Sequence, residues 1–418
     1  MARTPRALAR RGRRLLGYWR RERRTLTQGF VALFISSLGD LLAGLALAFM
    51  SDELGTLIGL AVLIPAAIGM RGNIFGALGS RLGTGLNSGQ YRPSWEPRAF
   101  LRQNVMGSVY LTFATCLFLG FAAHAVASAF TTGPVISVWS FAVISIIGGV
   151  LGSLVVGGSS VAISVLSFRR EWDLDSVSAP LVTAIGDIAT LPCLYLAAKL
   201  VENAPSLVPA VGIVASLACL AATIQGLRVD SAIVRRIVRE SMPVLFLAGA
   251  IDCLAGAVLE QRIDRFLALP ALFILVPPFL EDTNALAGIL SSRLASKLHL
   301  GVIEPKAWPQ TLALIDISIN FLFAFSVFFF VGFSSNLIAV VTGNATPGLA
   351  TMLSISLIAG FLATIFSSLV AYYTAVATFR FGLDPDNHGI PISSSVMDLL
   401  GTLCLVLVIL LLGVSAHG

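Results

Sequence analysis

The chain has 418 residues, of which 56% are hydrophobic and 12% are charged, and its mean hydropathy is +0.88. A soluble protein carries about 25% charged residues, and no polar stretch of this chain is long enough to form a soluble domain of its own. The composition therefore excludes a soluble globular protein and predicts an all-α polytopic membrane protein.

Apolar segments close to the ~20 residues that cross the hydrocarbon core of a bilayer recur along the chain. We predict eleven membrane-spanning helices, in chain order at residues 28–50, 54–82, 103–130, 134–167, 178–200, 207–227, 242–260, 267–293, 308–341, 346–378 and 390–414. The second and the eighth contain prolines, small residues and charges, as in PAAIGMRGNIFGALGSRL at 65–82. We expect both of these helices to be interrupted, so that polar backbone faces an ion path.

Basic residues are distributed unevenly between the two sides of the membrane. The first 24 residues contain ten arginines, and a cytoplasmic N-terminus places 24 of the 28 Lys and Arg residues inside, as the positive-inside rule requires. We therefore expect a multi-pass protein of the plasma membrane, with residues 1–27 as a basic cytoplasmic segment. The net charge of +6 reflects this topology, so it indicates contact with the lipid bilayer and gives no indication of nucleic acid as a partner.

The chain contains an internal repeat, which is the most informative feature of the sequence. A shift of 212 residues places Pro65 on Pro277, and a shift of 211 aligns 168–187 with 379–398 without a gap. One single-residue deletion reconciles the two shifts. The two halves of the chain therefore descend from one duplicated unit.

The repeat predicts the domain organisation. Two five-helix units at 28–200 and 242–418 are joined by a linking helix and a cytoplasmic loop at 201–241. The linking helix returns the chain to its starting side, so the units run parallel and are related by an axis along the membrane normal. Such an axis favours one pathway between the two halves of a single chain, with a homodimer as the alternative.

Two aspartates, Asp187 and Asp398, occupy equivalent places in the fifth helix of each unit. An ionisable group inside a membrane helix faces the bundle interior or water and is a candidate site. Thr183 and Ser394 lie about one turn before these aspartates. Two unpaired carboxylates repel in a low dielectric unless a cation lies between them, and oxygen ligands suit the hard cations Mg²⁺, Ca²⁺ or Mn²⁺. The alternative is that each aspartate only forms hydrogen bonds in helix packing.

A second duplicated pair, Asp40 and Asp252, lies in the first helix of each unit. These residues could form another station of the pathway, stabilise helix packing, or pair with Arg71 inside the membrane. Asp40 and Asp282 are the expected salt-bridge partners of Arg71. Asn73 and Asn284, in the second and eighth helices, are further candidate ligands.

Other polar residues of the spans leave two interpretations open. Asn104 and its equivalent Asp316 could line the pathway or form structural hydrogen bonds, and the same holds for Glu281 and Asp282. Loop carboxylates could attract cations at the cytoplasmic mouth or cap the helices that follow; they are Asp173, Asp175, Asp384 and Asp386. Motifs of ATPases, serine hydrolases and zinc peptidases do not occur, so we predict neither an enzyme nor a bound cofactor.

The stretch VLIPAAIGMRGNIFGALGSRLGTGLNSG at 62–89 resembles the second-helix signature of MgtE-type magnesium channels. The fifth-helix segments DLDSVSAPLVTAIGD and DPDNHGIPISSSVMD are similar to the acidic loop, proline and final aspartate of that family. The tandem arrangement is closest to the eukaryotic solute-carrier magnesium transporters. The resemblance implies that Asp187 and Asp398 contact a hydrated ion at the pore centre, and that this is a minimal prokaryotic form without the cytosolic sensor domains.

We therefore expect a transporter or channel for divalent cations, with Mg²⁺ as the transported ion and a pathway between the two halves. One alternative is a Na⁺- or H⁺-coupled carrier of another substrate, in which the same aspartates bind Na⁺ or relay protons. The other is a membrane receptor or scaffold that transports nothing.

Overall fold

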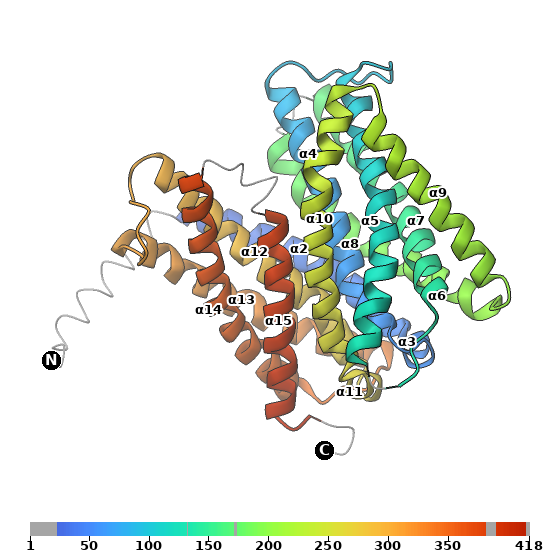
Figure 1. The fold of residues 1–418 in the computed structure, drawn as a ribbon. Helices are drawn as coiled ribbons and strands as arrows, with labels where there is room; N and C mark the ends of the chain where they lie inside the picture. Colours follow the sequence, from blue (N-terminus) through green and yellow to red (C-terminus); the bar gives the residue numbers. More distant parts are fainter. Residues whose placement is uncertain (1–22, 132, 171–173, 382–389, 415–418) are drawn as a thin grey trace.

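The computed structural model describes residues 23–131, 133–170, 174–381 and 390–414 (Figure 1). Within these ranges the side chains at 23–28, 32, 174–181, 183 and 390 are not described. The candidate ligand Thr183 and the four loop carboxylates proposed for the cytoplasmic mouth therefore lie outside the described residues or side chains. All elements in the described ranges are helical.

The helices confirm the all-α fold class, and eleven of the helical spans are long and apolar enough to cross a membrane. The segments α6, η2 and α7 follow one another without a break and form one of these spans. The elements in chain order are α2 (Arg23–Phe49), α3 (Ser51–Thr56), η1 (Leu60–Val62), α4 (Leu63–Asn87), α5 (Phe100–Phe130), α6 (Val138–Val143), the π-helical segment η2 (Ile144–Gly148), α7 (Gly149–Arg170), α8 (Leu174–Asn203), α9 (Val208–Arg228), α10 (Ala232–Glu260), α11 (Ile263–Ala268), α12 (Ala271–His299), α13 (Thr311–Thr342), α14 (Leu349–Phe381) and α15 (Ile390–Leu411).

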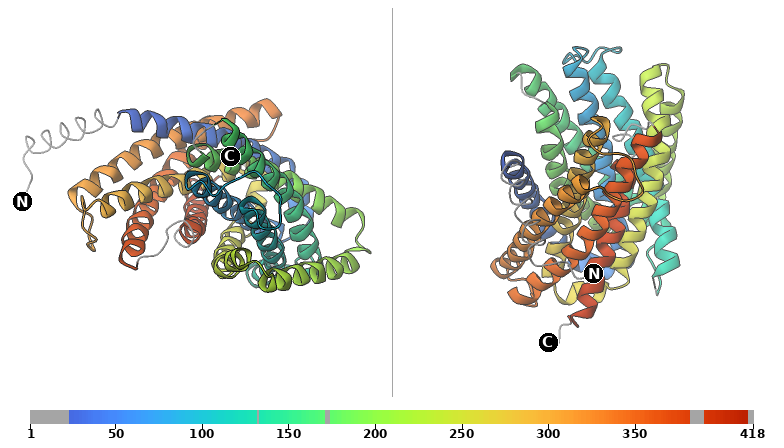
Figure 2. Two further views of the ribbon diagram at one scale, coloured as in Figure 1. Left: turned by 90° about the horizontal axis from the view of Figure 1, so that it is seen from above. Right: turned by 90° about the vertical axis from the view of Figure 1, so that its left-hand side faces the viewer.

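The first membrane helix of each repeat packs mainly against the other repeat. Helix α2 lies along α12 and α13 of the second repeat, and α10 lies along α4 and α5 of the first. Each also contacts the fifth helix of its own repeat, α8 for α2 and α15 for α10. Figure 1 shows α10 between α15 and α5, and Figure 2 shows α2 beside the helices of the second repeat. The two halves are therefore interlocked.

Glycine permits this exchange at two equivalent positions. A Cβ on Gly44 of α2 would overlap the carbonyl oxygen of Ile274 at the start of α12. A Cβ on Gly256 of α10 would overlap the carbonyl oxygen of Val62, just before α4. Only a residue without a side chain allows the backbones to approach this closely, so the duplicated glycines fix both crossings.

The expectation of interrupted second and eighth helices is wrong. Helix α4 is continuous from Leu63 to Asn87, and Pro65 lies in its first turn, where the backbone N–H has no intrahelical acceptor to lose. Helix α12 continues through Pro277 and Pro278. The irregular backbone lies before α4 instead, where Gly59 has φ 97° and leads into the short 3₁₀ turn η1.

Candidate ion site in the helix core

One pair of carboxylates converges on α4 from the second repeat. Asp252 of α10 and Asp398 of α15 are 0% and 5% exposed. A Cβ on Gly69 would lie 3.0 Å from Asp252 Oδ2 and 3.6 Å from Asp398 Oδ2. The small size of Gly69 therefore leaves room for two carboxylates against the same turn of α4.

The equivalent pair of the first repeat lies across the core. Asp40 of α2 and Asp187 of α8 are 0% and 2% exposed, and their carboxyl groups lie close enough to form a hydrogen bond when one carries a proton. Both oxygens of Asp40 and both of Asp252 have no hydrogen-bond partner, and neither does Asp187 Oδ2. Burial without partners is unfavourable for a carboxylate. These carboxylates therefore need a partner that the helices themselves do not supply.

Glu281 of α12 lies between the two pairs. It interacts electrostatically with Asp187 and Asp252, and Asp398 interacts with it in turn. The shift of 212 residues places Glu281 on Gly69, so the second repeat puts a carboxylate where the first repeat has only hydrogen. Asp398 also interacts electrostatically with Asp187, so Glu281 belongs to one network with the fifth-helix aspartates of both repeats.

Asp282, the neighbour of Glu281, has a local partner. The Ser37 hydroxyl of α2 lies 2.9 Å from both Asp282 Oδ1 and Oδ2 and 2.8 Å from the Leu33 carbonyl. Asp282 and Ser37 are both fully buried. This contact joins α2 to α12 and adds to the exchange of first helices, so Asp282 has a structural contact that the unpartnered aspartates lack.

The predicted ligands of α12 and α15 are divided between the site and its surroundings. Asn284 donates a hydrogen bond from Nδ2 to Asp398 Oδ1 at 2.8 Å, while its own Oδ1 has no partner. Ser394 instead donates to the Pro391 carbonyl at 3.0 Å. The neighbouring Ser395 lies beside Asp252, and its hydroxyl has no hydrogen-bond partner. Ser395 is therefore better placed than Ser394 to serve the site.

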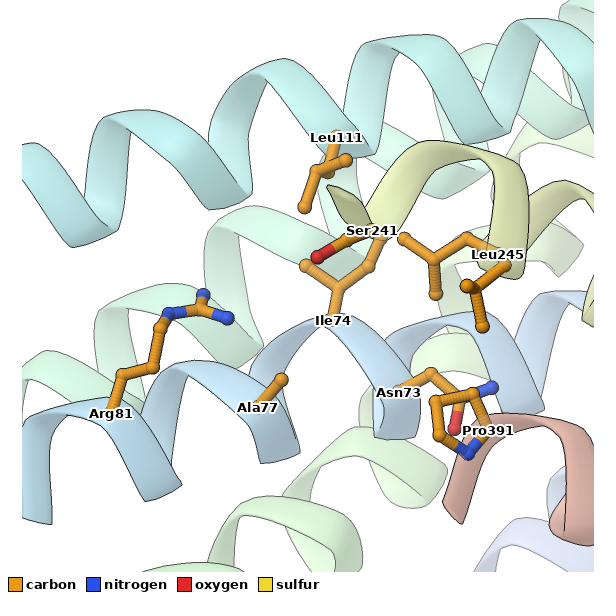
Figure 3. Close-up of a pocket in the computed structure, with 9 residues that line it drawn as sticks. Asn73, Ile74, Ala77, Arg81, Leu111, Ser241, Leu245 and Pro391 are labelled. Atoms are coloured by element: carbon orange, nitrogen blue, oxygen red, sulfur yellow. The ribbon is translucent and has the colours of Figure 1, made fainter. Parts of the chain in front are cut away.

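Asn73 lies one turn along α4 from Gly69, at a small cavity of about 10 Å³ between α4, α5, α10 and α15. Figure 3 shows its side chain beside Pro391, with Ala77 and Arg81 following along the same helix. The Asn73 Nδ2 group has no hydrogen-bond partner. The Asn73 amide nitrogen therefore donates no hydrogen bond to the carboxylates, and Asn73 lines a different cavity from Glu281 and Asp398.

A second small cavity marks the pseudo-twofold axis. It has a volume of about 10 Å³ and is lined by Glu281, Asp398 and three pairs of equivalent residues, which are Ile64 and Val276, Pro65 and Pro277, and Ile68 and Leu280. This volume corresponds to about one water molecule. The space at the axis between α4 and α12 is therefore small, and its lining is apolar except for Glu281 and Asp398.

The suggested pairing of Arg71 with Asp40 or Asp282 is wrong. Arg71 donates from Nη1 to the Ala67 carbonyl, and its Nη2 lies 3.4 Å from the carbonyl oxygen of Gly148. Gly148 ends the π-helical segment η2. A Cβ on Gly152 would lie 2.7 Å from Arg71 Nε. The π-helical turn and this glycine provide the space for the guanidinium, which still acts on Asp187 electrostatically.

The open question about Asn104 and Asp316 is resolved in favour of structural bonds. Arg81 of α4 donates from Nε to Asn104 Oδ1 at 3.0 Å. Its equivalent Arg293 of α12 forms an ion pair with Asp316, with 2.9 Å between Nη2 and Oδ1. The duplicated arginines therefore join the second helix of each repeat to the third.

Glu281 and Ser395 are the site residues that sequence reasoning underestimated. Glu281 has no acidic counterpart in the first repeat, so comparing the two halves gave it less weight than the duplicated aspartates. The lack of a counterpart was itself a signal, because a carboxylate in a membrane helix is energetically costly and usually has a functional role. Ser394 and Ser395 are adjacent serines on different faces of α15, and only the packing of α15 shows that Ser395 is the one next to Asp252.

Across the described residues, no three His, Cys, Asp or Glu side chains converge as they would around a directly bound metal ion. The core instead offers carboxylates in pairs. Mg²⁺ keeps several of its waters and is bound through one or two carboxylates. The arrangement therefore suits a hydrated hard cation better than a dehydrated one.

Comparisons with known proteins agree with this chemistry. The MgtE family model, described as "Divalent cation transporter", matches residues 64–197 and 276–408, one match in each repeat. Solute carrier family 41 member 3 of Rattus norvegicus is 26% identical over 413 residues, covering 93% of this chain and 87% of that protein. The Mus musculus protein of the same name is 26% identical over 372 residues, covering 83% and 74%.

Among solved structures, the eukaryotic MATE transporter AtDTX14 aligns with a TM-score of 0.34 at 15% identity, over 94% of this chain and 96% of that one. That score is too low to show a shared fold. The family match, by contrast, covers more than half of the chain and confirms the resemblance seen in the sequence. The chain belongs to the MgtE family of divalent cation transporters.

Proposed function

We propose that this chain carries Mg²⁺ across the plasma membrane, along a pathway between the two repeats of a single chain whose N-terminus is cytoplasmic. The observation that supports this proposal is the burial of the four duplicated aspartates in one core with most of their oxygens unpartnered. Asp187 and Asp398 are the residues that the family resemblance assigns to the ion. A divalent cation supplies the positive charge that these buried carboxylates lack.

The pairing of the carboxylates favours Mg²⁺ over cations that shed their water readily. Each half of the core offers two aspartates, and Asn284 holds Asp398 in position. Ca²⁺ is bound by six to eight oxygen ligands, whereas Mg²⁺ is held through one or two carboxylates and retained water. The ion is the substrate, and the chain performs no covalent chemistry on it.

Transport along this pathway requires the second helices to separate. The cavity at Glu281 and Asp398 holds about 10 Å³, the space of about one water molecule. A hydrated Mg²⁺ ion is much larger. Helices α4 and α12, which meet at Pro65 and Pro277, must therefore move apart before an ion passes the carboxylates.

The test is Mg²⁺ uptake into liposomes that contain the purified protein and a trapped Mg²⁺ indicator. We compare the wild type with the double variant Asp187→Asn plus Asp398→Asn. Glu304→Gln is the matched control, because Glu304 is an exposed carboxylate paired with Lys306. We expect the double variant to lose at least about tenfold in rate, equivalent to about 1.4 kcal/mol of ion interaction, while the control keeps the wild-type rate.

Two outcomes contradict the proposal. Absence of Mg²⁺ uptake by the wild type indicates a receptor, a scaffold or a carrier of another substrate. An unchanged rate in the double variant removes the two aspartates from the pathway. Mg²⁺ uptake that stops when a Na⁺ or H⁺ gradient is abolished supports the proposal and shows in addition that transport is coupled to that gradient.

A further inference from the structure

The four duplicated aspartates form two pairs, one within each repeat. Asp40 of α2 faces Asp187 of α8, and Asp252 of α10 lies with Asp398 of α15 against Gly69. In each pair a first-helix aspartate meets the fifth-helix aspartate of the same repeat. The contacts of α2 with α8 and of α10 with α15 bring each pair together, and the exchange of first helices places the second pair against Gly69 of the first repeat.

The first-helix aspartates lack a basic partner: their electrostatic neighbours are other carboxylates, and Ser36 and Ser395 are the hydroxyls beside them. Asp40 and Asp252 are each 0% exposed, and all four of their oxygens have no hydrogen-bond partner. Other buried carboxylates of the protein do have partners: Ser37 donates to Asp282, and Arg293 pairs with Asp316. Unpartnered oxygens that are buried and face a second carboxylate are arranged as a cation site would be.

The space between the two pairs is unsuitable for a single shared ion. The axial cavity is lined by Glu281, Asp398 and three equivalent pairs of apolar residues, and its volume of about 10 Å³ is the space of about one water molecule, too small for a hydrated ion. Glu281 interacts with Asp187 of one pair and Asp252 of the other, so it adds negative charge between them.

The charge of the core also favours more than one cation. Five buried carboxylates and the partly buried Glu281 surround the site, and Arg71 contributes one positive charge toward Asp187. If all are ionised, one divalent cation leaves three negative charges and two leave one. Excess charge of one sign is strongly unfavourable in a low dielectric.

We propose that the core holds two divalent-cation sites side by side, one at Asp40 and Asp187 and the other at Asp252 and Asp398, with Glu281 between them. This proposal rests on the proposed function and specifies how many ions the site takes. Asn284 and the free Ser395 hydroxyl complete the second site. The first site has the positive field of Arg71 next to it and therefore binds its ion more weakly.

Mn²⁺ provides the probe, because it accepts the same oxygen ligands as Mg²⁺ and is paramagnetic. We count the Mn²⁺ ions bound per chain in detergent by electron paramagnetic resonance and record the magnetic coupling between them. Addition of excess Mg²⁺ shows whether both ions compete for the same positions. We expect two Mn²⁺ ions of unequal affinity in the wild type, coupled to each other and displaced by Mg²⁺.

Two single variants assign the ions. We expect Asp252→Asn to remove the tighter ion, Asp40→Asn to remove the weaker one, and the double variant to bind neither. In each single variant the magnetic coupling disappears while one ion remains. Glu304→Gln is again the control, and size-exclusion profiles and melting temperatures show whether the variants fold.

A wild-type protein that binds one Mn²⁺ ion, kept in Asp40→Asn, overturns the two-site proposal. The wild-type count is decisive even if a variant fails to fold. It is also separate from the proposed function: one bound ion together with Mg²⁺ uptake leaves that function intact, whereas absence of uptake contradicts the function whatever the count.

Discussion

Arg71 shows how a single buried charge can adjust an ion site that it does not touch. Its guanidinium is held by the Ala67 and Gly148 carbonyls and acts on Asp187 at a distance. A positive charge in a low dielectric disfavours a second positive charge nearby. At the proposed site beside Asp187, we therefore expect Arg71 to weaken cation binding, which is compatible with an ion that must leave as well as enter.

We predict that Arg71→Gln raises divalent-cation affinity at the weaker site by at least about fivefold, the equivalent of about 1 kcal/mol. Glutamine keeps an amide donor for the carbonyls but removes the charge. Titration of the purified protein with Mn²⁺ measures the change. Arg81→Gln serves as the comparison, because Arg81 bonds to Asn104. The Mn²⁺ affinity of this variant should equal that of the wild type. Equal affinities for Arg71→Gln and wild type would show that the guanidinium has no influence on the site.

The two arginine contacts between second and third helices differ in kind, and their stability effects should differ too. Asp316 is 1% exposed and is held by Arg293 and Lys297, whereas Asn104 is a neutral acceptor for Arg81. Removing one partner of a buried ion pair costs about 3–5 kcal/mol, and removing a neutral hydrogen-bond partner costs about 1–3 kcal/mol. We expect Asp316→Ala to lower the melting temperature in detergent more than Asn104→Ala does. The reverse order would mean that solvent or lipid headgroups already satisfy Arg293.

At the scale of helices, the crossings of α2 over α12 and of α10 over the start of α4 hold the two carboxylate pairs in place. Both crossings depend on a glycine against a backbone carbonyl, Gly44 against Ile274 and Gly256 against Val62. Close packing of this kind provides helix association inside a bilayer, where the hydrophobic effect between helices is absent. The position of Asp252 therefore follows from Gly256, one turn further along α10.

We predict that Gly256→Ala destabilises the protein by about 1–3 kcal/mol, because the added methyl group overlaps backbone that cannot rotate away. Gly288→Ala is the control: nothing lies within 4 Å of a Cβ at that position of α12, and alanine favours a helix by up to about 1 kcal/mol over glycine. The measurement is the melting temperature of each variant in the same detergent. Equal melting temperatures for the two variants would contradict the close crossing at Val62.

At the scale of the whole molecule, the exchange of first helices makes each half depend on the other. Helix α2 contacts α12 and α13, and α10 contacts α4 and α5. The bond between Ser37 and Asp282 adds a buried polar contact across the same boundary. A half expressed alone would expose the glycine-lined faces and the unpartnered carboxylates of its core to lipid.

We predict that neither half of the chain is stable alone and that the two assemble when expressed together. A break in the loop between α9 and α10, at 229–231, separates the halves without cutting a helix. An affinity tag on one half should recover the other at equal amounts, and the reconstituted pair should carry Mg²⁺. A monodisperse first half with Mn²⁺ affinity of its own would contradict this dependence.

The sequence by itself determined the eleven membrane helices, because the hydropathy of each segment decides whether it can cross the bilayer. It also determined the duplication and the family, because both are visible as repeated motifs at a fixed spacing. It also selected Asp40, Asp187, Asp252 and Asp398, since carboxylates in apolar segments stand out without a structure. It did not determine whether Pro65 breaks α4, because a proline interrupts a helix only beyond the first turn.

Only the tertiary structure decided which carboxylates meet. Each first-helix aspartate meets the fifth-helix aspartate of its own repeat through the contacts of α2 with α8 and of α10 with α15. The exchange of α2 and α10 then places these pairs against the other repeat, through contacts between residues more than 200 positions apart, such as Gly44 with Ile274. The same packing places Glu281 between the pairs and leaves Arg71 to backbone carbonyls. Periodicity gives the face of a helix on which a residue lies, but the neighbour on that face is set by how the helices pack.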